Sequence, residues 1–190
     1  TLAFNHCYSA KKIILPDTVT KIEFSAFSEC RFLEEIILPD SIESIGGNAF
    51  WKCDSMESIA LPNKVKALDI ALFHCCSELK KVEFPSALKR IGTGCFSGCR
   101  KMKTIELPHG LEKIDEGAFE SHGIETIVIP DSIKMITERA FQMCWDLKNV
   151  YVPYDTELVD YQTDDDSPFY CCNPFICLHV FRGSKAEEWA

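Results

Sequence analysis

The sequence predicts an α/β repeat solenoid that coils in about eight turns of roughly 23 residues, with parallel strands stacked along one face. Three observations predict it: a recurring phenylalanine, a proline twelve residues after it, and an alternating apolar stretch before each proline. One repeat cannot bury its apolar positions alone, whereas stacked neighbours bury them as continuous ladders. A compact α/β domain, the alternative, would not place Phe, Pro and Cys in register so many times.

The phenylalanine sets the length of each turn. Eight of the 13 phenylalanines share this position: Phe4, Phe27, Phe50, Phe73, Phe96, Phe119, Phe141 and Phe169. The first five intervals between them are equal, the sixth is one residue shorter, and the last is five residues longer. The short interval predicts a deletion near His122. The long interval predicts an acidic insertion before Pro168.

The insertion carries four carboxylates, namely Asp160, Asp164, Asp165 and Asp166. Clustered carboxylates could hold Ca²⁺, which takes six to eight oxygen ligands. No calcium-loop spacing is present, however, so we expect a solvated loop.

Each predicted strand ends at a proline, at Pro16, Pro39, Pro62, Pro85, Pro108, Pro130 and Pro153. In the triplet before it, such as Ile36-Ile37-Leu38, the outer members are apolar and the middle one varies. This alternation indicates a strand with one buried face. Proline then ends the strand, because it lacks the N–H group that a ladder requires.

We divide the chain into residues 1–167, which hold repeats 1–7 with the insertion near 155–167, and residues 168–190, a degenerate eighth repeat with a C-terminal cap. Ser184 followed by Glu187 predicts a capping box that opens a short helix, with Trp189 closing the last apolar turn. The first repeat begins at its own Phe4 without a cap. An uncapped apolar end favours weak self-association through the N-terminal end.

The net charge argues against two classes of partner, nucleic acids and anionic membrane surfaces. The net charge is −9, from 29 acidic and 20 basic residues. A nucleic-acid-binding protein is expected to carry a basic stripe, and anionic membranes attract basic surfaces, so both are disfavoured. No apolar run approaches the roughly 18–20 residues that span a bilayer, so no membrane insertion is expected.

Most of the eleven cysteines occupy one position, three residues after the phenylalanine: Cys7, Cys30, Cys53, Cys76, Cys99, Cys144 and Cys172. Only His122 interrupts this column. We expect a ladder of small buried thiols, because neighbouring side chains that point the same way suit neither a chain of disulfides nor a tetrahedral zinc site. Cys95 is expected in the core. For Cys75, Cys171 and Cys177, free thiols and a bridge both remain open.

No catalytic pattern is present. The five histidines fall in unrelated columns, and the sequence has no glycine-rich phosphate loop, no C-x-x-C pair and no H-E-x-x-H motif. We therefore predict no enzyme, no cofactor and no metal site.

The columns together read L-x-x-I-x-L-P-x-x-[IV]-x-x-I-x-x-x-A-F-x-x-C, and residues 28–46 follow this pattern closely. It resembles the BspA-like, or Treponema pallidum-type, leucine-rich repeat. The resemblance implies a right-handed coil with its parallel sheet on the concave face. It also implies an extracellular or cell-surface location and attachment to host matrix or cell-surface proteins, while glycan binding through the same face remains open.

The candidate binding residues are the outward side chains of the predicted strands. They are Lys12, Ile14, Glu35, Ile37, Ser58, Ala60, Lys81, Glu83, Thr104, Glu106, Thr126, Val128, Asn149 and Tyr151. Function in solenoids tends to lie on such an extended surface, although β-propensity alone also explains apolar residues on a strand. The hypotheses are a protein-binding adhesion module, a rigid spacer that displays another domain, and a glycan-binding module.

Overall fold

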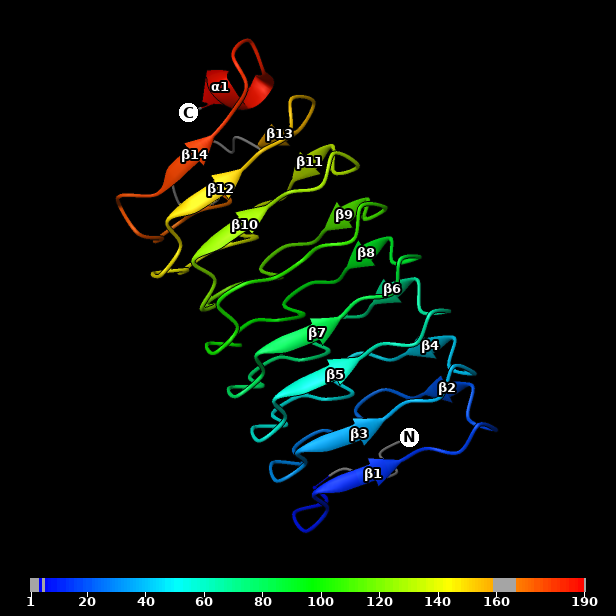
Figure 1. Cartoon of the computed structure of the whole chain (residues 1–190). Coiled ribbons are helices and arrows are strands. Elements are labelled where there is room, and N and C mark those ends of the chain that lie inside the picture. Colours follow the sequence, from blue (N-terminus) through cyan, green and yellow to red (C-terminus); the bar gives the residue numbers. More distant parts are fainter. Residues whose placement is uncertain (1–3, 5, 159–166, 190) are drawn as a thin grey trace.

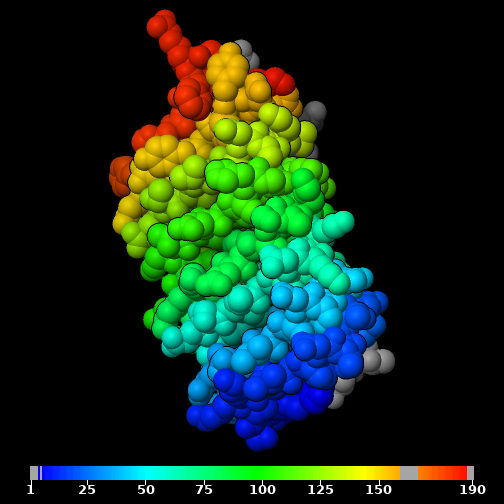
Figure 2. Space-filling view, turned by 45° about the vertical axis from the view of Figure 1, so that its right-hand side comes forward, coloured from blue at the N-terminus to red at the C-terminus, as the bar shows by residue number. Residues whose placement is uncertain are grey.

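The computed structural model describes residue 4, residues 6–158 and residues 167–189. The chain coils into a rod whose turns follow one another in sequence order, as the successive colour bands in Figure 2 show. Two rows of short parallel strands run along the rod (Figure 1). The four residues of the acidic insertion named above lie outside the described residues.

The first row contains the strands that precede the prolines: β1 (Lys12–Ile14), β3 (Glu35–Ile37), β5 (Ser58–Ala60), β7 (Lys81–Glu83), β10 (Thr126–Val128), β12 (Asn149–Tyr151) and β14 (Cys177–His179). The second row contains β2 (Lys21–Ile22), β4 (Ser44–Ile45), β6 (Ala67–Leu68), β8 (Arg90–Ile91), β9 (Lys113–Ile114), β11 (Met135–Ile136) and β13 (Glu157–Leu158). The turn between β7 and β10 has no first-row strand. At that position Thr104 forms only an isolated parallel bridge with Thr126. The parallel-strand solenoid predicted from the sequence is confirmed.

The strand register follows the repeat. Ile13 pairs with Ile36, and Ile127 pairs with Val150. Val150 in turn pairs with Leu178. The interval between these two residues is five residues longer than the usual repeat, so the insertion leaves the strand pairing intact.

The prolines turn the chain from the first row to the second. In each of the seven turns the proline carbonyl accepts a hydrogen bond from the backbone N–H three residues later, as in Ile42 to Pro39 at 3.1 Å. The missing N–H of proline ends the first strand, and its carbonyl closes a tight turn. The second strand follows directly, with one buried residue such as Ile45.

The recurring phenylalanines form the centre of the core. Their rings stack from Phe4 to Phe169 with centroids 5.3–5.7 Å apart and interplanar angles of 4–12°. Stacked rings at this spacing bury large apolar areas in offset contact. Phe50, Phe73, Phe96, Phe119 and Phe141 are fully buried.

The recurring phenylalanines have residues with left-handed backbone close to them in the chain. Two residues before it, φ is positive at Ser25, Asn48, Ala71, Gly94, Gly117 and Arg139; two residues after it, at His6, Glu29, Lys52, Cys75, Gly98, Ser121, Met143 and Cys171. A residue with positive φ interrupts a right-handed helix. The segments opposite the strands are therefore turns, and α1 (Lys185–Trp189) is the one helix among the described residues.

All eleven cysteines are unbridged. Six of the seven cysteines in the repeated column donate from Sγ to the carbonyl oxygen of the phenylalanine one turn earlier. The pairs are Cys30–Phe4, Cys53–Phe27, Cys76–Phe50, Cys99–Phe73, Cys144–Phe119 and Cys172–Phe141, at 2.8–3.3 Å. The predicted ladder of buried thiols is found at five of its seven positions, while Cys7 and Cys172 are only partly buried; Cys95 is buried in the core. Cys171 and Cys177 are exposed free thiols.

His122 takes the cysteine position in the turn with the deletion. Its Nδ1 accepts the backbone N–H of Ile124 at 3.1 Å, so the neutral ring carries its hydrogen on Nε2. That Nε2 is buried and has no hydrogen-bond partner in the described part of the chain. The next residue is Gly123, where a Cβ atom would collide with the carbonyl of Arg100. Because glycine has no Cβ, the shortened turn can lie this close to the backbone of Arg100 in the preceding turn.

The C-terminal helix α1 begins at a side-chain cap. Ser184 Oγ accepts the N–H of Glu187 at 3.2 Å, while the Glu187 carboxylate accepts the N–H of Gly183 instead of that of Ser184. The predicted capping box is therefore only partly formed. Lys185 joins α1 to β13 through an ion pair with Glu157. The side chain of Trp189 lies outside the described residues. No helix in the described ranges is long and apolar enough to cross a membrane.

Candidate binding face

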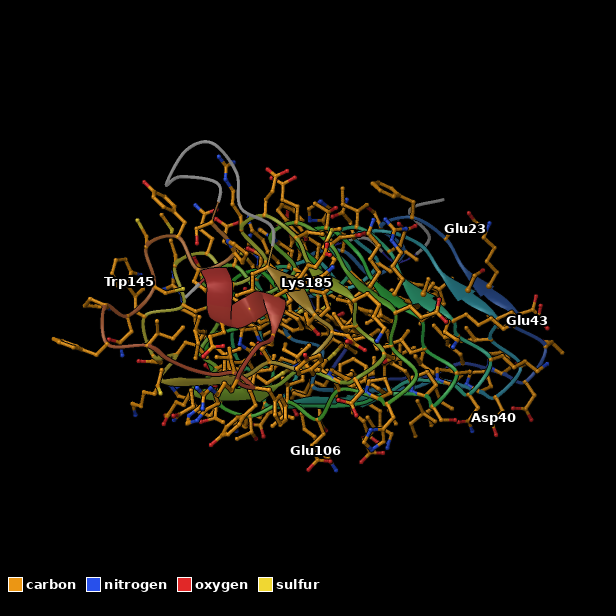
Figure 3. All side chains as sticks on the ribbon, turned by 90° about the horizontal axis from the view of Figure 1, so that it is seen from above. Glu23, Asp40, Glu43, Glu106, Trp145 and Lys185 are labelled. Atoms are coloured by element: carbon orange, nitrogen blue, oxygen red, sulfur yellow. The ribbon has the colours of Figure 1, made fainter. Side chains whose placement is uncertain are left out.

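The fourteen candidate residues all lie on the outward side of the first row. Twelve are exposed, while Thr126 and Asn149 are half-buried. Consecutive turns place them in rungs, such as Ile14 beside Ile37 and Val128 beside Tyr151. In Figure 3 Glu106 points away from the ribbon on this side, whereas Trp145 lies at a different edge. The face is thus a row of outward side chains that other parts of the described chain leave open.

The N-terminal part of this face is an apolar strip with charged edges. Ile14 and Ile37 pair across β1 and β3, and their exposed fractions are 65% and 43%. Beside them, Lys12 and Glu35 form an ion pair at 2.7 Å. Ala60 continues the strip on β5, although β5 is not hydrogen-bonded to β3.

The C-terminal part contains an aromatic platform. The rings of Tyr151 and His179 stack with centroids 4.1 Å apart and an angle of 9°. The His179 Nε2 contacts Asn149 Oδ1 at 2.9 Å, which fixes the imidazole on the platform. His179 was not among the predicted site residues. The alternation of the sequence does place His179 in the same outward row as Tyr151, but across the interval that is five residues longer, and it was not chosen as a candidate.

The first row is interrupted at two places, and at each of them two consecutive turns carry the same charge just before the strand position. The residue just before each strand is Lys11, Glu34, Glu57, Lys80, Lys103, Glu125 and Lys148 in successive turns. Opposite charges pair where the strands pair, as in Lys11–Glu34 and Lys80–Glu57, both at 2.9 Å. The ladder is open between β3 and β5, where glutamates 34 and 57 adjoin, and between β7 and Thr104, where lysines 80 and 103 adjoin.

The second interruption opens a slot between β7 and β10, with a volume of about 700 Å³. Its inner wall contains core side chains of two turns, Val82, Phe84, Ile105 and Leu107, which are only half-buried. The equivalent residues Ile59, Leu61, Ile127 and Ile129 in adjacent turns are buried. We call this groove, with Glu83, Glu106 and Val128 at its rim, the slot. It exposes part of the apolar core through the sheet.

The second row has its own opening, between β4 and β6. A groove of about 780 Å³ there is lined mainly by polar and charged side chains, including Lys64, Lys66, Asp69 and Arg90. Beside it, the nearly buried carboxylate of Asp115 accepts hydrogen bonds from the Arg90 guanidinium, with Nε 2.7 Å away. This ion pair joins β8 to the segment after β9 and is structural.

The described residues contain no group of three or more His, Cys, Asp or Glu side chains that could hold a metal ion. What the face offers chemically is apolar contact, aromatic stacking, ion pairing and main-chain hydrogen bonding. These are the means of non-covalent recognition.

Comparison with solved structures identifies the same fold in bacterial proteins. The leucine-rich repeat protein of T. pallidum is 27% identical, with a TM-score of 0.59, over 79% of this chain and 60% of that protein. A leucine-rich cell surface protein of Faecalibacterium prausnitzii is 22% identical, with a TM-score of 0.62, over 100% and 64%. The pneumococcal vaccine antigen PcpA is 19% identical, with a TM-score of 0.59, over 91% and 57%. The chain spans less than two thirds of each of these proteins.

No curated protein matches the sequence. The family model of BspA-type leucine-rich repeat regions matches residues 1–99 and 71–175 in six copies, fewer than the eight turns expected from the phenylalanines. The match indicates a binding scaffold and no catalytic family. Because it covers most of the sequence, the chain belongs to the BspA-type leucine-rich repeat family.

Proposed function

We propose that the chain is a protein-binding adhesion module that uses the outward face of the first row. The observation that carries this proposal is the exposed apolar rung of Ile14 and Ile37, on the same face as the aromatic Tyr151. Exposed apolar and aromatic side chains within a polar surround are the usual anchors of protein interfaces. The partner class is a host matrix or cell-surface protein.

An extracellular or cell-surface location is part of the proposal. It is supported by the Faecalibacterium prausnitzii relative, which is described as a cell surface protein, and by the pneumococcal relative, which is described as a vaccine antigen. Secretion or display of the parent protein would bring the first-row face into contact with host proteins.

The test is a binding screen against host extracellular proteins with two charged variants, Ile37→Glu and Tyr151→Glu. Matched controls lie off the face: Ile70→Glu, at a residue 49% exposed, and Tyr154→Glu, at a residue 54% exposed. We expect the two face variants to lose at least tenfold in affinity, while the controls bind like the wild-type chain. Equal binding by all four variants would contradict a role for this face.

A rigid spacer is the structural alternative, and it predicts that no partner binds the wild-type chain. Glycan binding is favoured by one observation, the Tyr151–His179 platform with the amide of Asn149 beside it. A glycan array separates the two classes of ligand. Binding to sugars that Tyr151→Glu abolishes and Ile37→Glu leaves unchanged would indicate the glycan alternative.

A further inference from the structure

The slot between β7 and β10 has main-chain donors without partners. At the position after each first-row strand, the backbone N–H normally bonds to the next turn, as in Leu61 to Glu83 at 2.9 Å and Ile129 to Tyr151 at 3.0 Å. The equivalent N–H groups of Phe84 and Leu107 make no such bond within the described part of the chain. Both residues line the slot. An occupant that brings carbonyl oxygens would satisfy these donors.

The inner wall of the slot is apolar. Val82, Phe84, Ile105 and Leu107 are core residues that the open ladder leaves half-buried, and Val128 at the rim is 59% exposed. Phe84 is held in place by an edge-to-face contact with Phe96, with centroids 5.9 Å apart. This wall offers an apolar side chain more contact than the flat strand surface elsewhere on the face.

The rim of the slot carries two carboxylates, Glu83 and Glu106, and one ammonium group, Lys81. The Lys81 ammonium is paired with Glu83 at 2.7 Å, so its charge is already compensated. Glu106 makes no ion pair with any described residue, and it points away from the ribbon (Figure 3). Lys81 also interacts electrostatically with Glu106, but it makes its contact ion pair with Glu83, so the Glu106 carboxylate keeps room for a second cation.

We propose that the slot receives an extended segment of a partner protein in which an apolar side chain is followed by lysine or arginine. The apolar side chain contacts the inner wall, the main-chain carbonyls accept the N–H groups of Phe84 and Leu107, and the cation pairs with Glu106. Main-chain hydrogen bonds combined with side-chain pockets are the means by which open sheets recognise extended peptides. This inference rests on the proposed protein-binding function and names the chemistry of the partner.

The experiment is an NMR titration of the whole chain, labelled at Ile, Leu and Val methyl groups, with two capped octapeptides. Both have Gly-Ser flanks; one carries a central Phe-Lys pair and the other a central Phe-Glu pair. We expect the Phe-Lys peptide to shift the methyl signals of Val82, Leu107 and Val128 saturably. The Phe-Glu peptide should bind at least fivefold more weakly.

Charge reversal supplies the decisive comparison. Glu106→Lys should weaken binding of the Phe-Lys peptide at least fivefold and strengthen binding of the Phe-Glu peptide. The matched control is Asp40→Lys, since Asp40 is also an exposed carboxylate without an ion partner among the described residues and lies far from the slot. Both variants must keep the wild-type melting temperature, because the changed side chains are exposed.

Equal affinity for the two peptides, or shifts spread away from the slot, would overturn the proposal. These outcomes are distinct from a failure of the proposed function. If Glu106→Lys leaves capture of a host protein unchanged while Ile37→Glu abolishes it, the face binds proteins but the slot does not. If no host protein binds the wild-type chain, the adhesion proposal fails whatever the peptides show.

Discussion

The thiol of Cys76 donates a hydrogen bond to the carbonyl oxygen of Phe50 in the preceding turn, at a distance of 3.0 Å. The same contact recurs in five other turns, so each of these six cysteines joins one turn of the solenoid to the turn before it. A buried carbonyl without a donor is costly, and cysteine supplies the donor while filling little space. The high cysteine content is thus explained by packing.

The buried thiols make stability depend on alkaline pH. Burial raises the pKa of the Cys76 thiol well above its ordinary value. The unfolded chain therefore loses its proton first, and the stabilisation is present below the unfolded pKa and lost as pH rises toward the folded pKa. Above about pH 8.5 each such thiol should lower the free energy of unfolding by roughly 1.4 kcal/mol per pH unit.

Urea denaturation of the wild-type chain and of Cys76→Ala between pH 7 and 10 tests this dependence. At pH 7 the variant should cost about 1–2 kcal/mol, from lost packing and an unsatisfied carbonyl. Its slope with pH should then be shallower than that of the wild-type chain. Cys177→Ala, which removes an exposed thiol, should leave the slope unchanged. Identical slopes for Cys76→Ala and the wild-type chain would contradict the prediction.

His122 makes the fold sensitive to acid. Burial, with a smaller contribution from the charge of Lys103, lowers the pKa of His122 to about 3. The unfolded histidine takes up a proton below about pH 6.5, whereas the folded one stays neutral, so stability is full above 6.5 and falls as pH decreases toward 3. The loss should be roughly 2 kcal/mol at pH 5.

Melting temperatures measured at pH 7 and pH 5 provide the readout, with His122→Gln as the comparison because glutamine stays neutral. We expect the wild-type chain to lose several more degrees than His122→Gln over this interval. A variant that is equally sensitive to acid would show that other groups, such as carboxylates, control the decline.

At the left-handed position two residues before the phenylalanine, a change to glycine should raise the free energy of unfolding and a change to alanine should lower it. Ala71 has φ of 52° and Gly94, one turn later, has φ of 60° with open space where a Cβ would stand. Ala71→Gly should stabilise the fold by about 0.5–1 kcal/mol, because glycine adopts this conformation without strain. Gly94→Ala should destabilise it by about 1–2 kcal/mol. Two changes of the same sign in urea titrations would refute this account.

Gly123 should tolerate no side chain. Its Cβ would collide with the carbonyl of Arg100, and backbone cannot move aside as a flexible side chain can. Gly123→Ala should therefore cost about 3 kcal/mol in denaturant titrations. Gly110→Ala is the control, since the nearest atom to its Cβ would lie at an ordinary 3.4 Å. If the two variants cost the same, the shortened turn is more adaptable than the structure indicates.

The repeat pattern predicted the parts of the fold that depend on periodic burial. Phe50, Pro62 and Cys76 each occur at fixed offsets, and the structure places them in the ring stack, the turn between the rows and the thiol ladder. The outward positions followed from alternation along the strands, so residues such as Ile37 and Tyr151 could be located before their neighbours were known. Whether they bind a partner stays a prediction.

The left-handed positions were not predicted, because most are occupied by residues other than glycine. Lys52 and Met143 carry positive φ that no local propensity indicates, since hydrogen bonds to the adjacent turn, such as Lys52 N–H to His74 O at 2.9 Å, hold the backbone there. The capping interaction of Glu187 with Gly183 likewise depends on the geometry of the last turn.

The sequence by itself determined the turn length, the buried columns and the outward face, because these require only a period and the preference of apolar side chains for the interior. The tertiary structure alone decided where the sheet opens. Phe84 and Leu107 are a full repeat apart in the sequence, and only the stacked turns show that β7 does not pair with the Thr104 segment, which leaves the two N–H groups without the main-chain partners found in other turns. The slot therefore arises from contacts between turns, which a single repeat does not contain.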